Sequence, residues 1–174
     1  MGQMTAVASS PFPADSSGPL SAAALAAANI NPHTGLATDY LNHFNEAIML
    51  LEMIPAMPEC TEDFLLWEPL SYPEHFLQSG FKARDLAIAA YEAADPELRV
   101  RFDGVCHSMT KILTEIRKAM TATTQPEIHM RLAEQAMEWL KPLVTRAGGI
   151  INGENDGAAG DGKAQSAADL IMSA

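Results

Sequence analysis

Residues 96–120 carry the feature that most constrains the fold, because large apolar residues recur there with an unbroken spacing of four and three. This seam consists of Leu98, Phe102, Val105, Met109, Ile112 and Ile116. In a helix of 3.6 residues per turn, such spacing places the apolar side chains on one face and leaves the other face polar. Asp95 precedes the pattern as an N-cap residue, followed by Pro96 at the first helical position. A helix with this seam is expected to pack against other helices.

Two further segments show helical periodicity. Residues 36–54 are predicted to form a helix with Thr34 or Thr38 as its N-cap and with Pro55 just beyond its end. Residues 81–94 form the next predicted helix, which ends just before the Asp-Pro pair of the seam helix. The excess of Ala and Met over β-branched residues also favours helix over strand.

A last long helix is predicted near the C-terminal end of the packed region. Thr124 and Glu127 match a capping box, in which each side chain accepts a backbone N–H of the first turn. Gly148 and Gly149 are expected to end this helix. Pro142 lies inside it and is expected to cause a kink unless the helix ends early, because proline lacks the N–H that a helix interior requires.

The connection formed by residues 55–80 contains four prolines, which exclude a long helix. A short helix is predicted from Thr61, as N-cap, to Trp67, and another short turn is expected before residue 80. Together these segments predict an all-α protein: an antiparallel bundle of about four main helices, with short helical turns in the 55–80 connection.

The sequence divides into four parts by composition. Residues 1–33 are rich in Ser, Pro and Ala and are predicted to form a mobile arm, in which residues 20–32 could form a short helix capped by Ser21. Residues 34–148 contain the helical patterns and form the predicted bundle domain. Residues 149–164 form an acidic, glycine-rich linker that is expected to be flexible, and residues 165–174 form a short amphipathic segment.

The charge distribution limits the possible partners. The net charge is −11, and no Lys or Arg occurs in residues 1–81. Such a surface repels polyanions, so we expect no binding to nucleic acid or to anionic membranes. No apolar run approaches the length that spans a bilayer. Cys60 and Cys106 do not form a Cys-x-x-Cys pair, which favours two reduced thiols in a cytoplasmic protein.

The sequence contains no motif typical of an enzyme or a metal protein. It lacks a nucleophile elbow, a phosphate-binding loop and a Glu-x-x-His pair, which favours a non-catalytic protein without cofactor or metal. His43 and Glu46 form a reversed version of the pair, which we interpret as a solvated helix edge. Asp103 and His107 lie one turn apart on the polar face of the seam helix, which is more typical of a surface contact than of a catalytic dyad.

Three methionines are the strongest candidates for a functional surface. Met49 and Met53 lie near the end of the first predicted helix, opposite its main apolar face, and Met57 follows Pro55. Because methionine adapts to irregular surfaces, these side chains either pack under the 55–80 connection or bind a protein partner or a second copy of the chain. The C-terminal segment offers a second candidate, since Leu170, Ile171 and Met172 follow a flexible tether. They could dock on a partner, fold back on the chain's own bundle or form a disordered tail.

An alternative hypothesis places a small apolar ligand or a metal inside the bundle. The 55–80 connection is unusually aromatic for a loop, and His129 falls within the apolar stripe of the last helix. A pocket beneath this connection would be lined by Trp67, Tyr72, His75, Phe76 and His129.

Overall fold

A computed structural model describes residues 11–12 and 18–154 of the chain. Within these residues the protein is all-α, with seven α-helices, one 3₁₀ helix and no strand. The elements are α1 (Ala22–Ala27), η1 (Thr38–Tyr40), α2 (Leu41–Met53), α3 (Cys60–Leu66), α4 (Tyr72–Gln78), α5 (Arg84–Ala93), α6 (Pro96–Thr121) and α7 (Pro126–Ile151). This confirms the predicted fold class, including the short helices in the 55–80 connection.

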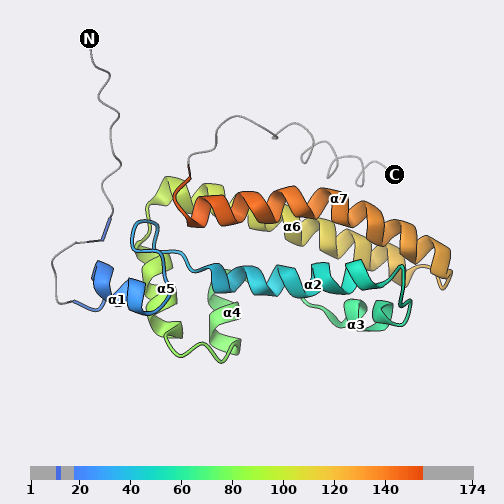
Figure 1. The fold of residues 1–174 in the computed structure, drawn as a ribbon, viewed down its shortest axis with the longest axis horizontal. Helices are drawn as coiled ribbons and strands as arrows, with labels where there is room; N and C mark the ends of the chain where they lie inside the picture. The colour runs from blue at the N-terminus through green and yellow to red at the C-terminus, as the bar shows by residue number, and fades with distance from the viewer. Residues whose placement is uncertain (1–10, 13–17, 155–174) are drawn as a thin grey trace, which may run out of the picture.

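The helices α6 and α7 form an antiparallel hairpin that runs the length of the molecule, and α2 packs antiparallel to α7 (Figure 1). The predicted seam of α6 faces inward, since Phe102, Met109 and Ile112 have almost no exposed surface. Asp95 caps α6 as expected, because its carboxylate accepts the N–H of Leu98 at 2.9 Å. Three long helices thus form the bundle, and α3, α4 and α5 cover α2 and the end of the hairpin (Figure 1).

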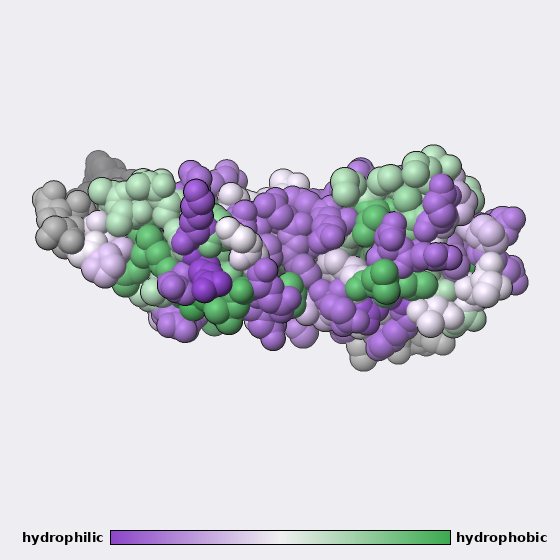
Figure 2. Space-filling model, turned by 90° about the horizontal axis from the view of Figure 1, so that it is seen from below, coloured by the Kyte–Doolittle hydropathy of each residue, from purple (hydrophilic) through white to green (hydrophobic). Residues whose placement is uncertain are grey.

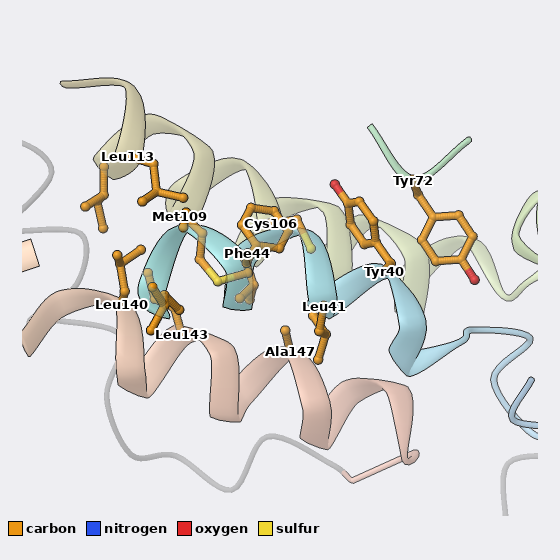
Figure 3. Close-up of a cluster of buried hydrophobic side chains, with 14 of the residues drawn as sticks. Tyr40, Leu41, Phe44, Tyr72, Cys106, Met109, Leu113, Leu140, Leu143 and Ala147 are labelled. Carbon is orange, nitrogen blue, oxygen red and sulfur yellow. The ribbon is translucent and has the colours of Figure 1, made fainter. Parts of the chain in front are cut away.

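The core lies where these three helices meet (Figure 3). Phe44 of α2, Met109 of α6 and Leu140 of α7 are fully buried there. Tyr40 and Tyr72 extend the cluster toward α4 and α5, so the core changes from aliphatic to aromatic along its length. Within the described residues, no helix has the length and apolarity needed to cross a membrane.

The start of α7 differs from the prediction. Gln125 is the N-cap residue and no side chain caps the helix, so the capping box of Thr124 and Glu127 does not form. The hydroxyl of Thr123 instead accepts the N–H of Gln125 at 3.2 Å, in the turn before the helix, and α7 begins at Pro126.

The end of α7 also differs. The helix continues through Pro142 and past Gly148 and Gly149 to Ile151. Leu143 and Ile150 remain buried on the same face as the preceding turns. Packing against α2 and α6 therefore outweighs the weak helix propensity of these residues, which amounts to about 1 kcal/mol for a glycine and about 3 kcal/mol for a proline.

The first long helix begins later than predicted. Residues 38–40 form η1, and α2 starts at Leu41. Ala37 is extended because its N–H donates to the hydroxyl of Tyr72 at 2.9 Å, so neither Thr34 nor Thr38 caps the helix. This tertiary bond links α4 to the entrance of α2.

The predicted starts of two other helices are also wrong. The helix α3 begins at Cys60, one residue before the expected cap Thr61, whose buried hydroxyl has no hydrogen-bond partner among the described residues. The helix α5 begins at Arg84 and not at residue 81, because the N–H of Phe81 donates to the hydroxyl of Ser79 at 3.3 Å.

Part of the predicted arm belongs to the core. Leu25 and Ile30 are fully buried, and the hydroxyl of Thr34 donates to the carbonyl of Ile151 at 2.7 Å. Gly35 has a φ of +72°, and a Cβ there would lie 2.5 Å from the ring of Phe12. The packed region therefore extends beyond both predicted bounds of the bundle domain, residues 34 and 148. The predicted linker and C-terminal segment lie largely outside the described residues.

Candidate functional site

A groove of about 520 Å³ lies where α3 and the following segment cross α2. Its lining comes from α2, α3, the 67–70 connection and the end of α4, and it consists of His43, Glu46, Met49, Leu50, Asp63, Leu66, Trp67, Glu68, Leu70 and Gln78. The 55–80 connection therefore covers the methionine-rich helix only in part, because α3 packs on α2 and leaves this groove beside it.

The groove presents two large apolar side chains to solvent. Met49 is 53% exposed and Leu66 is 77% exposed, although both belong to helices whose other faces are buried. Figure 2 views the α3 and α4 face and shows an apolar patch on the right, where α3 lies, framed by hydrophilic surface. Met57 lies beyond the groove lining and is 41% exposed, whereas Met53 is half-buried against the core.

The rim of the groove is acidic. Glu46, Asp63 and Glu68 all line it and are exposed. Glu68 pairs with Arg117 at 3.2 Å, and this arginine also donates to the carbonyl of Trp67. Glu46 and Asp63 have no such basic neighbour within the described residues, so the rim keeps a net negative charge.

The floor of the groove is built from His43 and Trp67, whose rings stack with centroids 4.8 Å apart. The indole N–H of Trp67 donates to the carbonyl of His43 at 3.1 Å. The N–H of Leu70 donates to Nε2 of His43 at 3.0 Å. One ring stack and two hydrogen bonds, both accepted by His43, thus connect α2 to Trp67 and Leu70.

The hydrogen bond from Leu70 requires a neutral imidazole at His43, because Nε2 acts as the acceptor. Burial of the ring, and secondarily the nearby His75, lowers the pKa of His43 to about 4. The reversed motif of His43 and Glu46 is therefore a floor residue beside a rim residue. No group of three or more His, Cys, Asp or Glu side chains that could hold a metal occurs in the described part of the chain.

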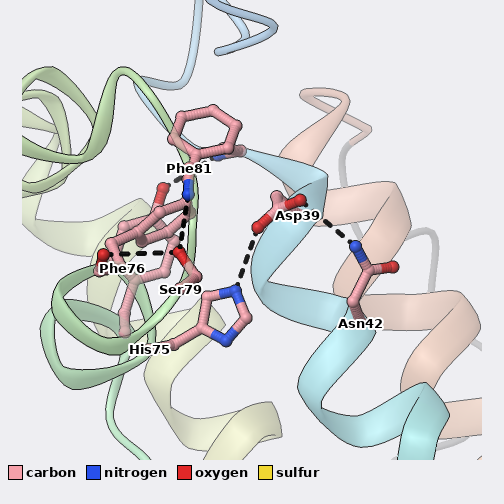
Figure 4. A network of polar contacts seen from close by, with 8 residues as sticks. Asp39, Asn42, His75, Phe76, Ser79 and Phe81 are labelled. Atoms are coloured by element: carbon pink, nitrogen blue, oxygen red, sulfur yellow. Dashed lines mark hydrogen bonds and ion pairs between the residues drawn. The ribbon is translucent and has the colours of Figure 1, made fainter.

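The residues of the alternative pocket lie in different surroundings. Trp67 lines the groove floor, whereas Phe76 is fully buried in the core. Tyr72 stacks on Tyr91 with ring centroids 4.5 Å apart. His75 bonds to Asp39 at 3.0 Å through Nε2 (Figure 4). These side chains mainly fasten α4 to its neighbours.

His129 lies apart from this group, at the turn that joins α6 to α7. Its Nε2 lies 2.9 Å from the carbonyl oxygen of Met120 and 2.8 Å from that of Thr123. The ring therefore closes the hairpin turn, which is the structural role that a histidine on an apolar stripe commonly has.

A second cleft, of about 420 Å³, lies between α4, α5 and α6 and includes Asp103, Cys106 and His107. Asp103 does not pair with His107, because it accepts hydrogen bonds from the Tyr91 hydroxyl at 3.0 and 2.9 Å. Burial raises the pKa of Asp103 and that of Cys106, and it raises the pKa of Tyr91 to about 12. The thiol and the phenol therefore stay protonated at neutral pH, and neither is activated as a nucleophile.

Sequence reasoning identified Met49 and Trp67 but missed Leu66 and the acidic rim. One signal was available, because Phe64 and Leu66 stand two positions apart in a short helix and must point to opposite sides. Only one of them can be buried when α3 packs on α2. The position of the groove, however, depends on the contact of Trp67 with His43, which no local pattern contains.

Comparisons of the chain with protein-family models, with curated proteins and with solved structures found no match. The function is therefore inferred from the geometry and charge of the groove.

Proposed function

We propose that the protein is a non-catalytic interaction module, and that the groove between α2 and α3 binds an amphipathic helix with basic side chains along its edges. The observation that carries the proposal is the combination of exposed Met49 and Leu66 with an acidic rim. An apolar helix face would fill the groove, and the rim would attract Lys or Arg beside it. Methionine suits this role because its flexible side chain adjusts to the partner.

Charge favours a foreign partner over a second copy. The chain has a net charge of −11, and residues 1–81, which contribute every lining residue of the groove, contain no Lys or Arg. Two such surfaces would repel each other, whereas a basic helix would be attracted and oriented. A second copy bound through the methionines would instead appear as a dimer in solution.

The predicted C-terminal contact remains part of the proposal. Leu170, Ile171 and Met172 lie outside the described residues. We propose that they add a second, tethered contact to the same partner, which would raise its effective concentration at the groove. Removal of residues 165–174 would then weaken binding to the partner without changing the affinity of an isolated helix for the groove.

The proposed setting is a reducing compartment such as the cytoplasm. Cys60 and Cys106 are both free and buried. Buried thiols serve as small apolar side chains in such a compartment and need no oxidising environment.

The test uses a labelled synthetic helix with leucines spaced three and four residues apart and lysines on both edges. Fluorescence anisotropy measures its affinity for the full chain and for the variants Met49→Glu and Leu66→Glu. We expect each variant to lower the affinity about tenfold or more, because a carboxylate would be buried against the apolar face.

The matched control is Val100→Glu. Val100 lies on α6, is 72% exposed and does not line the groove, so the substitution adds the same charge to an exposed apolar position elsewhere. We expect the affinity of Val100→Glu to stay close to that of the original chain. Equal losses in all three variants would show that the peptide responds only to net charge, and the groove proposal would be abandoned.

A further inference from the structure

A cavity of about 670 Å³, separate from the groove and from the cleft between α4, α5 and α6, lies at the opposite end of α2 from the methionines. It is open to solvent, and its walls are the end of α1 and the loop that follows it, η1 and the first turns of α2, Phe81, and the end of α7. Its polar lining consists of Asn29, Asn31, Thr38, Asp39, Asn42, Asn45 and Asn152. The volume falls within the range of about 300–1,000 Å³ that is common for small-molecule sites.

Side-chain amides are concentrated in this cavity. Five of the six asparagines in the chain line it, although they come from three separate segments. Among its described lining residues, Asp39 is the only one with a charged side chain. The cavity is therefore rich in neutral donors and acceptors and contains no Lys or Arg that would attract an anion.

Three of these amides are available to a ligand. The side chains of Asn29, Asn45 and Asn152 are exposed and make no hydrogen bond in the described structure. Asn31, by contrast, accepts the N–H groups of His33 and Thr34 at 2.8 and 3.3 Å, which fixes its orientation and leaves its NH₂ group as a donor.

Asp39 is already engaged on both sides (Figure 4). One carboxylate oxygen lies 3.0 Å from Nε2 of His75, and the other accepts the amide N–H of Asn42 at 3.2 Å. The carboxylate thus serves mainly to hold Asn42, and a single, occupied acid is a poor anchor for a metal or an ammonium group. The half-buried ring of Phe81 forms an apolar wall beside these polar groups (Figure 4).

We propose that this cavity binds a small neutral polyhydroxylated molecule, namely a sugar or a related polyol. Each hydroxyl of such a ligand can donate and accept, and each free amide offers both an oxygen acceptor and an NH₂ donor. The C–H face of a sugar ring would pack on Phe81. Phosphates and carboxylates are disfavoured, because no basic side chain faces the cavity among the described residues. The site is separate from the α2–α3 groove and does not depend on it.

The test follows the side-chain amide signals of the full chain by nuclear magnetic resonance during titration with glucose, maltose and lactose, each up to tens of millimolar. We expect at least one sugar to shift the signals of Asn29, Asn45 and Asn152 in a saturable way, with a millimolar dissociation constant. Inorganic phosphate, added in parallel at constant ionic strength, should leave these three signals unchanged.

Two variants check the assignment. Asn45→Ala removes an exposed amide from a helix, and Asn29→Gly removes one while keeping the backbone φ of +58° accessible. Each is expected to weaken sugar binding about tenfold, which equals about 1.4 kcal/mol. Gln135→Ala removes an exposed amide from α7 outside the cavity and should have no effect.

Three results would overturn the proposal. They are the absence of shifts with every sugar, equal sugar affinity in the Asn45→Ala variant and the original chain, and saturable shifts of the same amides with phosphate. The first two would exclude a sugar site at these amides, and the third would replace the neutral ligand class with an anion. None of them would affect the binding of a basic helix at the groove, so the two proposals fail independently.

Discussion

The α6–α7 hairpin and the α2–α3–α4 side of the molecule are held together in different ways. In the hairpin, aliphatic side chains such as Leu113 and Leu140 interlock along two long helices. On the other side, short helices are fastened by specific polar contacts, including those of His43 with Trp67 and of Tyr72 with Ala37. The hairpin is continuous and regular, whereas the opposite side leaves a groove and a cavity between its elements.

This difference separates stability from recognition. Apolar burial along the hairpin is non-directional and provides much of the stabilising free energy. Polar contacts on the other side contribute less each, but they fix the positions of α3 and α4 and so define the shape of the groove. Substitutions in the hairpin should therefore change the free energy of unfolding most, and substitutions in the groove should change binding most.

The largest expected effect is that of Leu113→Ala in the hairpin. Leu113 is fully buried, so truncation leaves a cavity between α6 and its neighbours. We expect the free energy of unfolding to fall by about 2–5 kcal/mol, measured by urea denaturation followed by circular dichroism. A loss as small as that of an exposed position would contradict the assignment of the core to the hairpin.

Acidification should lower the stability of the protein mainly through His43, on the α2–α3–α4 side. The pKa of His43 is about 4 in the folded protein, and it is near 6.5 when the chain is unfolded. The unfolded chain therefore binds more protons between pH 6.5 and pH 4. The lowered pKa of His43 therefore leaves the free energy of unfolding unchanged above pH 6.5. As the pH falls from 6.5 to 4, the free energy of unfolding decreases by up to about 3 kcal/mol.

The variant His43→Gln provides the control for this pH dependence. Its amide oxygen can accept the N–H of Leu70, but it does not titrate. The difference in stability between pH 6.5 and pH 4, measured by urea denaturation at each pH, should be smaller in this variant than in the original chain. Parallel pH profiles of the two proteins would show that His43 does not carry the effect.

A smaller effect is expected when single hydrogen bonds are removed on each side. Trp67→Phe loses the N–H bond to His43 and keeps an aromatic ring, and His129→Ala loses the contacts to the α6–α7 turn. Each should lower the free energy of unfolding by about 1 kcal/mol. Only Trp67→Phe should also weaken binding of the lysine-edged helix, as anisotropy with the labelled peptide would reveal.

The smallest expected change in stability is that of Leu66→Glu. Because Leu66 is 77% exposed, the substitution should change the free energy of unfolding by less than about 0.5 kcal/mol. A loss of stability comparable to that of a buried residue would mean that Leu66 belongs to the core of the protein. The weaker peptide binding of this variant would then reflect unfolding and would not test the groove.

The hairpin could be predicted from the sequence because its pattern is local. The spacing from Leu98 to Ile116 fixes the buried face of α6 without knowledge of any other element. The errors arose where distant contacts override local preference. The helix α7 continues past Gly148 and Gly149 to Ile151, where it packs against other elements. The helix α2 starts late because Tyr72 holds Ala37 in an extended conformation.

The candidate sites were less predictable for the same reason. Met49 was identified because it lies opposite the main apolar face of its own helix. The groove, however, requires the pairing of His43 with Trp67, and the amide cavity requires Asn29 and Asn152 to meet across most of the chain. Contacts between residues so far apart leave no periodic trace in a single sequence.

A charge exchange across the groove tests the central claim most directly. Asp63→Lys reverses one rim charge, and the labelled helix is prepared with lysines or with glutamates along its edges. We expect Asp63→Lys to weaken the lysine helix about three- to tenfold and to strengthen the glutamate helix, because a rim charge acts on its direct neighbours. Glu97→Lys, in the first turn of α6 at the opposite end of the hairpin from α3, changes the net charge equally and should alter neither affinity. If both variants shift the two affinities to the same extent, the peptide senses only overall charge, and the groove is not its binding site.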